Sequence, residues 1–255
     1  MTTLSIMRTF GLIGYPLSHS FSKKFFSEKF ETEQIADCKY ELYPIVHADE
    51  IKDLIANNKS LCGLNVTIPH KVNVLPFLSE IDEAAAEIGA VNCIAINQTG
   101  EKPFLKGYNT DAYGFAESLK PMLEKHHQKA LVFGDGGAAK AVKYVLTQLG
   151  ISYLSVVRNP APNAILYSAV TAAMLTEYTV LINTTPLGML PNLDSYPVIP
   201  YQHVTEKHLA YDLVYNPEET VFLGKVKTQG GKIKNGLEML YLQAERSWEI
   251  WNTGK

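Results

Sequence analysis

The sequence predicts an α/β protein of two domains with mainly parallel sheets. Strand-like runs rich in Val, Ile, Leu and Tyr alternate with helical patterns, as they do in βαβ units. These runs fall into two series, which predicts two domains with an active-site cleft between them. The composition allows this fold, because 255 residues with 46% hydrophobic and 19% charged side chains can form a buried core.

The first series of strands occupies the amino-terminal half of the chain. Its strands are expected at residues 7–13, 39–45, 63–68, 93–97 and 104–108. Apolar side chains at helical spacing fill the gaps between them and predict helices, for example at 21–30 and 81–88. This half therefore has the strand and helix content of an α/β domain of its own.

The second series begins at Ala130. Its strands are expected at 130–133, 153–157, 180–183 and 209–213, with a helix at 137–149. A long helix over 111–126, preceded by the capping types Asn109 and Thr110, is expected to join the two series. The proline-dense residues 186–200 predict a long loop.

The carboxyl-terminal residues 237–251 also predict a helix. Apolar side chains recur there at the spacing of one helical stripe, and they are Leu237, Leu240, Ala244, Trp248 and Trp251. Such a stripe is typical of a helix that packs against a domain core.

Charge and composition exclude several classes of protein. The net charge is −3, with 23 Lys and Arg against 26 Asp and Glu, which argues against a nucleic-acid partner. No apolar run approaches the roughly 18 residues that span a bilayer, and the amino terminus does not resemble a signal peptide. The three cysteines lack CxxC spacing, which favours reduced thiols over disulfides or a metal site. We therefore expect a cytoplasmic protein with no metal and no membrane partner.

A glycine-rich motif follows the expected strand at 130–133. The run GDGGAA at 134–139 matches G-x-G-x-x-A in the strand-to-helix setting of a dinucleotide fingerprint. Gly134 allows the tight turn, Gly136 lets a pyrophosphate approach the backbone, and Ala139 permits close packing of helix on strand. The start of the helix offers N–H donors to the phosphates. An ordinary turn with clustered glycines is the alternative.

The end of the next strand indicates which dinucleotide is bound. NAD-binding folds usually place an acid there for the ribose 2′-hydroxyl, whereas this chain has Arg158. Because a guanidinium suits a 2′-phosphate, the sequence favours NADP. A solvated arginine at a strand end is the alternative.

Polar residues in the first half indicate a second ligand. Ser18 and Ser20 lie between a strand and a helix, where both hydroxyls can bind one carboxylate or one of them can cap the helix. Asn65 and Thr67 share one face of a strand. Lys71 follows at the carboxyl end of that strand, which is where α/β proteins bind ligands.

Three further polar residues lie near strand ends. His70 is an acid–base candidate by residue type, although a single histidine is more often structural. Asn92 and Asp111 each stand beside a strand end. The helix dipole favours the ionised form of Asp111, which either serves the ligand or simply pairs with the dipole.

Eight short motifs follow one another along the chain. They read GLIGYPLSHSFS, NVTIPHK, GAVN, GYNTDAYG, GDGGAAKA, NTTPLGM, YDLVYNP and GLEMLYLQA. In this order they resemble the motifs of shikimate dehydrogenases, and they cover nearly the whole chain, from Gly11 to Ala244. The resemblance implies a substrate-binding domain at 1–108, a Rossmann-type NADP-binding domain inserted at 109–235, and a helix at 236–255 that returns to the first domain.

The resemblance also implies a reaction and the residues that serve it. The reaction is the reversible NADP-dependent reduction of 3-dehydroshikimate to shikimate, a step of chorismate and aromatic amino-acid biosynthesis. Lys71 and Asp111 would form the catalytic pair, with Lys71 exchanging the proton. The implied substrate-binding residues are Ser18 and Ser20 at the carboxylate with Tyr215 closing over it, and Asn65, Thr67, Asn92, Asp111 and Gln243 at the ring hydroxyls.

On the cofactor side, the resemblance implies contacts along the second domain. The pyrophosphate would be cradled by Gly134, Asp135, Gly136, Gly137 and Ala138. Arg158 would bind the 2′-phosphate and Thr184 the ribose. Leu213, Gly236 and Met239 would contact the nicotinamide, with a simple turn glycine as the alternative at 236. The chain departs from the family pattern at Asp135, where a small residue is usual, and beside Arg158, where Val157 and Asn159 replace Asn and Thr.

Other functions stay open. A quinate/shikimate dehydrogenase of the same fold that uses NAD typically carries an acid where Arg158 stands. A non-catalytic dinucleotide-sensing protein would keep the fold without the chemistry, and the presence of Lys71 and Asp111 argues against it. A purely structural module leaves the polar strand ends unexplained. We expect an enzyme with a small-molecule substrate, as a monomer or homodimer.

Overall fold

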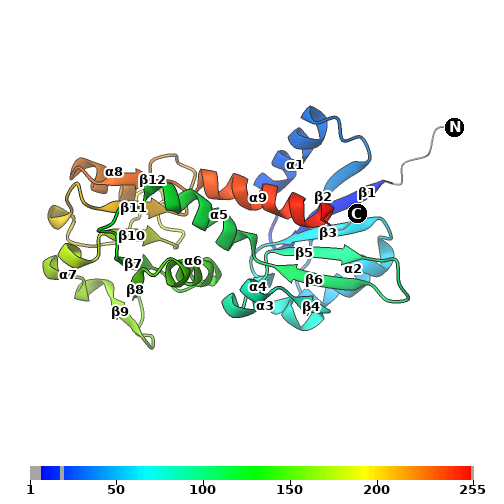
Figure 1. Cartoon of the computed structure of the whole chain (residues 1–255), viewed down its shortest axis with the longest axis horizontal. Helices are drawn as coiled ribbons and strands as arrows, with labels where there is room; N and C mark the ends of the chain where they lie inside the picture. The colour runs from blue at the N-terminus through cyan, green and yellow to red at the C-terminus, as the bar shows by residue number, and fades with distance from the viewer. Residues whose placement is uncertain (1–6, 18–19, 254–255) are drawn as a thin grey trace. The chain divides into compact units, whose positions relative to one another are not determined.

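The computed structural model describes residues 7–17 and 20–253. These residues divide into two compact units: those up to Thr110 and from Ala244 onward form unit 1, and Asp111–Gln243 form unit 2. Each unit has a β-sheet of its own (Figure 1). The predicted α/β class with two sheets is therefore confirmed. The predicted domain boundaries and the cleft stay predictions.

The sheet of unit 1 is mainly parallel, with one antiparallel strand. Its strands are β1 (Arg8–Gly14), β2 (Cys38–Pro44), β3 (Leu61–Val66), β4 (Glu80–Ile81), β5 (Cys93–Asn97) and β6 (Phe104–Tyr108). Their order is β2-β1-β3-β5-β6-β4. Strand β1 pairs in parallel with β2 and β3, and β4 with β6. Strand β5 runs antiparallel to both of its neighbours.

Alternating side chains of β1 enter two cores on opposite faces of this sheet. Ile13 packs in an aliphatic cluster with Leu64, and Leu12 in an aromatic cluster with Phe26 and Trp251. The connecting helices are α1 (Phe21–Thr32), α2 (Ile51–Asn57), α3 (His70–Asn73) and α4 (Glu83–Ile88), with 3₁₀ turns at Ala48–Glu50 and Leu75–Phe77. Trp251, near the carboxyl end of the last helix, donates from Nε1 to the Ile94 carbonyl at 3.0 Å, and this hydrogen bond joins that helix to β5.

The sheet of unit 2 is parallel throughout. Its strands are β7 (Lys129–Phe133), β8 (Ser152–Val157), β9 (Ala164–Leu166), β10 (Val180–Asn183), β11 (Leu209–Asp212) and β12 (Lys232–Lys234). Their order is β9-β8-β7-β10-β11-β12, the arrangement of a Rossmann sheet. The strand order reverses between β7 and β10, and ligands of such sheets bind beyond the carboxyl ends of these two strands.

Four helices accompany this sheet among the described residues. They are α5 (Thr110–Leu119), α6 (Gly137–Gln148), α7 (Ala172–Glu177) and α8 (Val221–Thr228), with 3₁₀ turns at Lys120–Met122, Tyr167–Ala169 and Tyr201–His203. Helices α7 and α8 pack in one apolar core with Leu131, Phe133 and Leu181 of the sheet. The residues between β10 and the turn at Tyr201–His203 form neither helix nor strand, which confirms the predicted long loop.

Helix α5 is shorter than predicted. The helix expected over 111–126 ends at Leu119 and continues only as a 3₁₀ turn. Pro121 lies in this turn, and proline cannot donate the N–H bond that an α-helix needs. The prediction of one long connecting helix was therefore wrong.

Helix α9 (Leu237–Asn252) begins in unit 2 and ends in unit 1. Of its predicted apolar stripe, Ala244 and Trp251 are buried, whereas Leu237 is exposed at the first position of the helix. The polar residues Gln243 and Ser247 are buried instead. The stripe was therefore predicted correctly toward the carboxyl end and incorrectly at Leu237.

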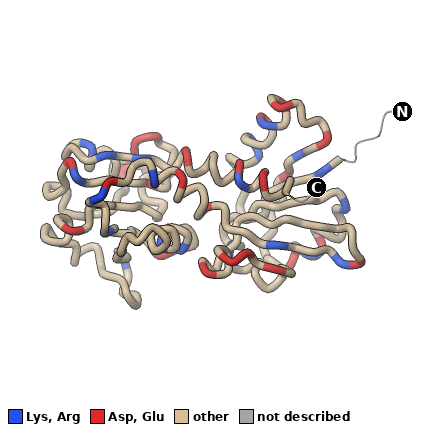
Figure 2. The backbone as a smooth tube through the Cα atoms, in the orientation of Figure 1, with Lys and Arg blue, Asp and Glu red and all other residues tan. Residues whose placement is uncertain are grey.

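Charged residues of both signs occur in both units among the described residues. Figure 2 shows basic and acidic residues interspersed along the backbone of both units. Within the described ranges, no helix is long and apolar enough to cross a membrane.

Burial raises the pKa of the Cys93 thiol to about 12, so that this thiol stays protonated at neutral pH.

Candidate active site

The glycine-rich turn after β7 requires a glycine at its first position. Gly134 has a φ of 104°, and its amide donates to the Val156 carbonyl at 2.9 Å. A Cβ at this position would lie 2.7 Å from Thr184 Oγ1 and 2.8 Å from Thr185 Cγ2. Backbone conformation and close packing therefore both exclude a side chain, because residues other than glycine are strained at positive φ.

We expect Gly134→Ala to be damaging for this reason. The new methyl group must displace Thr184 or Thr185 or abandon the backbone conformation, at a cost of roughly 1–2 kcal/mol in unfolding free energy. Urea unfolding monitored by circular dichroism measures that cost. Gly150→Ala is the matched control, because Gly150 also has a positive φ, of 70°, but has open space around its Cβ position. Equal losses in the two variants would show that packing against Thr184 and Thr185 adds nothing.

The start of helix α6 presents free space and backbone donors. Gly136 is the N-cap residue, and no side chain caps the helix there among the described residues. Apart from the adjoining residues and the backbone of the helix itself, no heavy atom of the described residues lies within 4 Å of the Cβ position of Gly136 or Gly137. Ala139, in contrast, is fully buried against the sheet. The turn therefore leaves room above the first N–H groups of the helix, as phosphate binding at a helix N-terminus requires.

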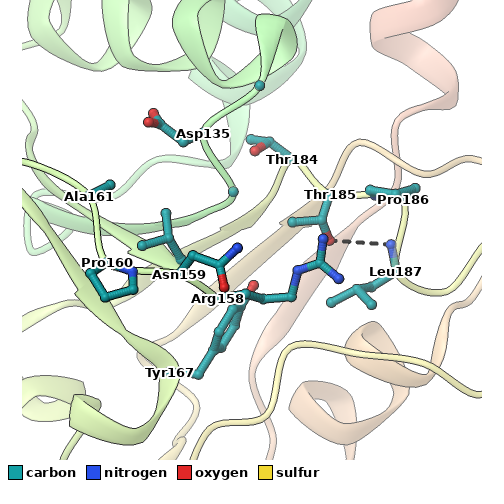
Figure 3. A pocket seen from close by; sticks show the side chains of 13 residues that line it. Asp135, Arg158, Asn159, Pro160, Ala161, Tyr167, Thr184, Thr185, Pro186 and Leu187 are labelled. Carbon is teal, nitrogen blue, oxygen red and sulfur yellow. Dashed lines mark hydrogen bonds between the residues drawn. The ribbon is translucent and has the colours of Figure 1, made fainter.

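The carboxylate of Asp135, in the glycine turn, is paired with a lysine of the following helix. Lys143, two turns further along α6, donates to Asp135 Oδ1 in an ion pair. Figure 3 shows the Asp135 side chain directed away from Arg158. An acid in the glycine loop is therefore compatible with an anionic ligand, because its charge is paired locally.

A pocket of about 430 Å³ opens beyond the carboxyl ends of β7, β8 and β10 (Figure 3). Its lining comes from the glycine turn, the end of β8 and the loop after β10. The lining residues are Gly134, Asp135, Gly136, Val157, Arg158, Asn159, Pro160, Ala161, Tyr167, Thr184, Thr185, Pro186 and Leu187. The pocket thus occupies the switch point of the sheet, where the fold predicts a ligand.

Arg158 provides the positive charge of this pocket. Its side chain is exposed and, in Figure 3, extends toward Thr185 and Leu187. Within the described part of the chain, no carboxylate forms an ion pair with it. A guanidinium without an internal counter-ion, beside a phosphate-binding turn, suits a ligand that carries an additional phosphate.

Among the lining residues, Gly134, Asp135, Gly136, Arg158 and Thr184 are ones that the sequence predicts for the cofactor, whereas Tyr167 and Leu187 were not predicted. Tyr167 stacks on Phe133 with ring centroids 5.9 Å apart, and burial raises the pKa of its hydroxyl. Thr185 lies beside Thr184 at the end of β10, a position that indicates contact with a cofactor, and Leu187 lies in the loop that continues from it. Tyr167 lies in a short 3₁₀ turn and offered no such signal.

Several predicted cofactor residues do not line this pocket. They are Gly137, Ala138, Leu213, Gly236 and Met239. Gly236 packs against the backbone of the strand end, since a Cβ there would lie 2.2 Å from the Leu213 carbonyl oxygen. This close approach supports the turn-glycine alternative, and the nicotinamide contacts stay predictions.

A buried polar network lies beneath the loop after β10. Asp212, fully buried at the end of β11, accepts from Asn183 Nδ2 at 2.9 Å, from the Val214 amide at 3.0 Å and from Thr220 Oγ1 at 2.6 Å. Burial raises the pKa of its carboxyl from 3.8 to about 6, against the opposing effect of these hydrogen bonds. The carboxylate is thus ionised at neutral pH but titrates in a mildly acidic range.

This raised pKa gives a prediction for stability. Between about pH 4 and 6 the folded chain keeps the Asp212 proton that the unfolded chain has lost, so the unfolding free energy falls as pH rises. The group's contribution should change by about 3 kcal/mol across this window and stay constant above it. Urea unfolding of the unchanged protein and Asp212→Asn from pH 4 to 7 measures the effect as the difference between two curves. Parallel curves would contradict the prediction.

In unit 1 the predicted amides are held in a second buried network. Asn65 accepts from Tyr40 at 2.8 Å and donates to Ser247 Oγ at 2.9 Å. Asn92 Oδ1 accepts from the Thr110 amide at 2.6 Å, and Asn92 Nδ2 approaches Thr110 Oγ1 at 3.0 Å. Both asparagines are at most 4% exposed. Most of their hydrogen-bonding capacity therefore serves the fold, and each keeps only a small part of it for a ligand.

The remaining predicted residues of unit 1 that the structure describes are Ser20, Thr67 and Lys71. Ser20 caps α1 by accepting from the Lys23 amide at 3.2 Å, as the capping alternative predicts, while Ser18 lies outside the described residues. Thr67 follows β3 and is partly buried, and Lys71 lies partly buried in the first turn of α3.

His70 is structural rather than ligand-facing. It is 1% exposed, and its Nε2 donates to the Ile45 carbonyl at 2.8 Å. Its Nδ1 has no hydrogen-bond partner in the described ranges. Its burial and its bond to a backbone carbonyl support the structural alternative.

Three predicted substrate residues belong to unit 2. Asp111 is partly buried in the first turn of α5. Tyr215 is 39% exposed after β11, and Gln243 is buried on α9 with Nε2 donating to the Leu240 carbonyl at 2.9 Å. Their roles toward a substrate stay predictions.

A Rossmann sheet with an open glycine turn and a pocket arginine defines a dinucleotide-binding α/β protein. In the described residues, no group of three or more His, Cys, Asp or Glu side chains could hold a metal ion. The N–H groups at the start of α6 and the guanidinium of Arg158 are donors that suit a phosphorylated organic cofactor.

Comparison with known proteins identifies the family. Residues 12–94 match the model of the shikimate dehydrogenase substrate binding domain. The NADP⁺ shikimate dehydrogenase of Desulforamulus reducens is 38% identical over 264 residues, covering 94% of this chain and 88% of that protein. The chain belongs to the shikimate dehydrogenase family.

Solved structures agree with this assignment. The shikimate dehydrogenase of Aquifex aeolicus superposes with a TM-score of 0.83 at 29% identity, covering 96% of this chain and 92% of that chain. The enzyme of Thermus thermophilus, solved in complex with NADP(H) and shikimate, gives 0.82 at 30% identity, with 96% and 94% covered.

Proposed function

We propose that this protein catalyses the reversible NADP-dependent reduction of 3-dehydroshikimate to shikimate. It is an oxidoreductase of the shikimate dehydrogenase family, whose relatives carry the NADP⁺ designation. The observation that carries the cofactor assignment is the position of Arg158 in the same pocket as the glycine turn. An acid at that position would favour NAD instead.

The pocket residues fit NADP in their donors and their free space. Gly134 and Gly136 would leave room for the pyrophosphate at the start of α6, and Arg158 would bind the 2′-phosphate. Thr184 would lie at the ribose, with its hydroxyl donating to the Phe133 carbonyl at 2.7 Å and so held in place.

Lys71 and Asp111 are the proposed catalytic pair. When bound, NADPH supplies the hydride that reduces the ketone carbon. Lys71, as an ammonium, would stabilise the negative charge that develops on the ketone oxygen and donate its proton there. In the reverse direction the neutral amine would accept the proton of the alcohol. Asp111 would orient Lys71 and bind the neighbouring hydroxyl.

The other proposed contacts hold the substrate. Ser18 and Ser20 would bind the carboxylate with Tyr215 over it, and a hydroxyl such as that of Ser20 can donate to a carboxylate while it accepts as a helix cap. The ring hydroxyls would be bound by Asn65, Thr67, Asn92 and Gln243. We expect a cytoplasmic enzyme, monomeric or homodimeric, without a nucleic-acid or membrane partner.

Absorbance of the reduced nicotinamide tests this function directly. Purified protein is incubated with shikimate or quinate, each with NADP or NAD. Reduction of NADP with shikimate, and little with quinate, is the expected result. Turnover of quinate with NAD would favour the alternative quinate/shikimate dehydrogenase. NADP binding without any turnover would favour a non-catalytic dinucleotide sensor.

A further inference from the structure

Asp212 is a buried carboxylate to which the proposed reaction gives no role. It lies at the carboxyl end of β11 with no exposed surface. Its three hydrogen bonds come from three different segments: Asn183 at the end of β10, Val214 in the turn after β11, and Thr220 at the start of α8. A single carboxylate thus joins the elements that border the cofactor pocket on one side.

Asn183 extends this network to the pocket wall. Its Oδ1 accepts from the Thr185 amide at 3.1 Å and from Thr185 Oγ1 at 2.6 Å, and its Nδ2 donates to the Leu187 carbonyl at 3.2 Å. Thr185 Oγ1 in turn accepts from the Leu187 amide at 3.3 Å, the bond drawn in Figure 3. Thr185 and Leu187 both line the pocket. The wall loop therefore rests on Asn183, and Asn183 is oriented by Asp212.

Thr220 supports the same loop from the other side. It caps α8 through the Leu223 amide and donates its hydroxyl proton to Asp212 Oδ2. The Cβ position of Gly188, the next residue of the loop, lies 3.1 Å from Thr220 Cβ. Asp212 is thereby linked to the loop through two residues, namely Asn183, which forms hydrogen bonds with the loop, and Thr220, which packs against Gly188.

We propose that Asp212 is a positioning residue for cofactor binding, which holds residues 184–188 in the shape that the NADP pocket requires. The inference rests on the proposed function. The charged form is the active one, because a carboxylate accepts all three hydrogen bonds as they stand. An amide or a protonated carboxyl has a donor on one side, so the hydrogen bond from Thr220 must reverse its direction or be lost. Loss of the charge, by mutation or protonation, loosens the pocket wall and weakens NADP binding.

The surroundings of Asp212 are otherwise neutral. Asn183, Thr220 and the Val214 amide, which face it, carry no charge. One titratable side chain, Tyr201, interacts with Asp212. The pKa of Tyr201 is raised mainly by burial, next by two neighbouring tyrosines, and then by the charge of Asp212. On the neighbouring strand β12, Lys234 is paired with Glu238. Within this network, the carboxyl of Asp212 is therefore the group that titrates near pH 6.

Calorimetric titration of the full-length protein with NADP⁺ tests the proposal without turnover. Asp212→Asn is expected to weaken NADP⁺ binding about 10-fold at pH 7.5. In the unchanged protein the dissociation constant should rise more steeply below pH 6 than in Asp212→Asn. Since the 2′-phosphate of NADP⁺ itself titrates near pH 6 in both proteins, the difference between the two profiles isolates Asp212. Coincident profiles would overturn the proposal.

If Asp212→Asn does not fold, a second pair of variants tests the role of the network through Thr220. Thr220→Ser keeps the hydroxyl and should bind NADP⁺ as the unchanged protein does, whereas Thr220→Val should weaken binding several-fold. Thr171→Val is the matched control, because Thr171 caps α7 through the Met174 amide but has no bond to the network among the described residues. Equal effects of the two valine variants on binding would mean that only helix capping matters and would overturn the proposal.

The same titrations separate this inference from the proposed function. Absence of NADP⁺ binding by the unchanged protein overturns both. Tight binding by the unchanged protein, with no loss in Asp212→Asn or Thr220→Val, overturns the inference alone and leaves the proposed function standing.

Discussion

Lys71→Ala should lower kcat for shikimate oxidation by about 10³- to 10⁴-fold, the upper range for losing a general acid–base group. Lys71 lies at the start of α3, immediately after the buried His70, whose ring donates to the Ile45 carbonyl. A rigid neighbour limits the positions that the Lys71 backbone can take. Alanine removes both the ammonium that stabilises the developing oxyanion and the proton that it donates. Initial rates at saturating shikimate and NADP measure the loss.

Two controls accompany this prediction. Shikimate binding, measured by titration, should change little, because the serine, threonine and amide contacts proposed for the substrate remain. Lys52→Ala is the matched variant in the same unit: Lys52 lies over the Phe77 ring at 4.9 Å and has no proposed role in the reaction. It should leave kcat unchanged. An unchanged kcat in Lys71→Ala would remove Lys71 from the mechanism.

Much of the fold could be predicted because it depends on local patterns. Strands β5, β6 and β10 lie at the predicted residues, since each is a short apolar run bounded by turn residues. The predicted length of helix α5 was wrong for an equally local reason. Pro121 ends the α-helix even though the apolar periodicity continues beyond it. The antiparallel placement of β5 was missed, since strand direction depends on pairing between distant segments.

Some residues of the site could likewise be predicted from the sequence, and others could not. The glycine turn and Arg158 could be identified because their types and their spacing from strands have a direct chemical meaning. Asn65 and Asn92 were recognised as important, but only the structure shows that their amides bond mainly to Tyr40, Ser247 and Thr110. Asp212 was missed altogether. A single acid in a strand gives no periodic signal, and its partners lie up to 29 positions away in the chain.

Arg158→Ala should lower kcat/KM for NADP by about 10³-fold while changing the value for NAD less than about threefold. The arginine lies exposed in the pocket at the end of β8, without a carboxylate partner among the described residues. Two charge-assisted hydrogen bonds to a 2′-phosphate, each worth roughly 1.5–3 kcal/mol, account for a loss of this size. NAD lacks the 2′-phosphate and serves as the internal control for the fold of the variant.

Arg158→Lys should give an intermediate loss of kcat/KM for NADP. Lysine keeps the charge but cannot bind a phosphate through a planar fork, so its kcat/KM for NADP should lie between those of arginine and alanine. The glycine turn has no part in this discrimination, since the pyrophosphate that it would bind is common to both cofactors. Initial rates with each cofactor at fixed saturating shikimate give the ratio. If Arg158→Ala lowers the NADP and NAD values equally, Arg158 supports the pocket without reading the 2′-phosphate, and the preference for NADP must come from another of its lining residues.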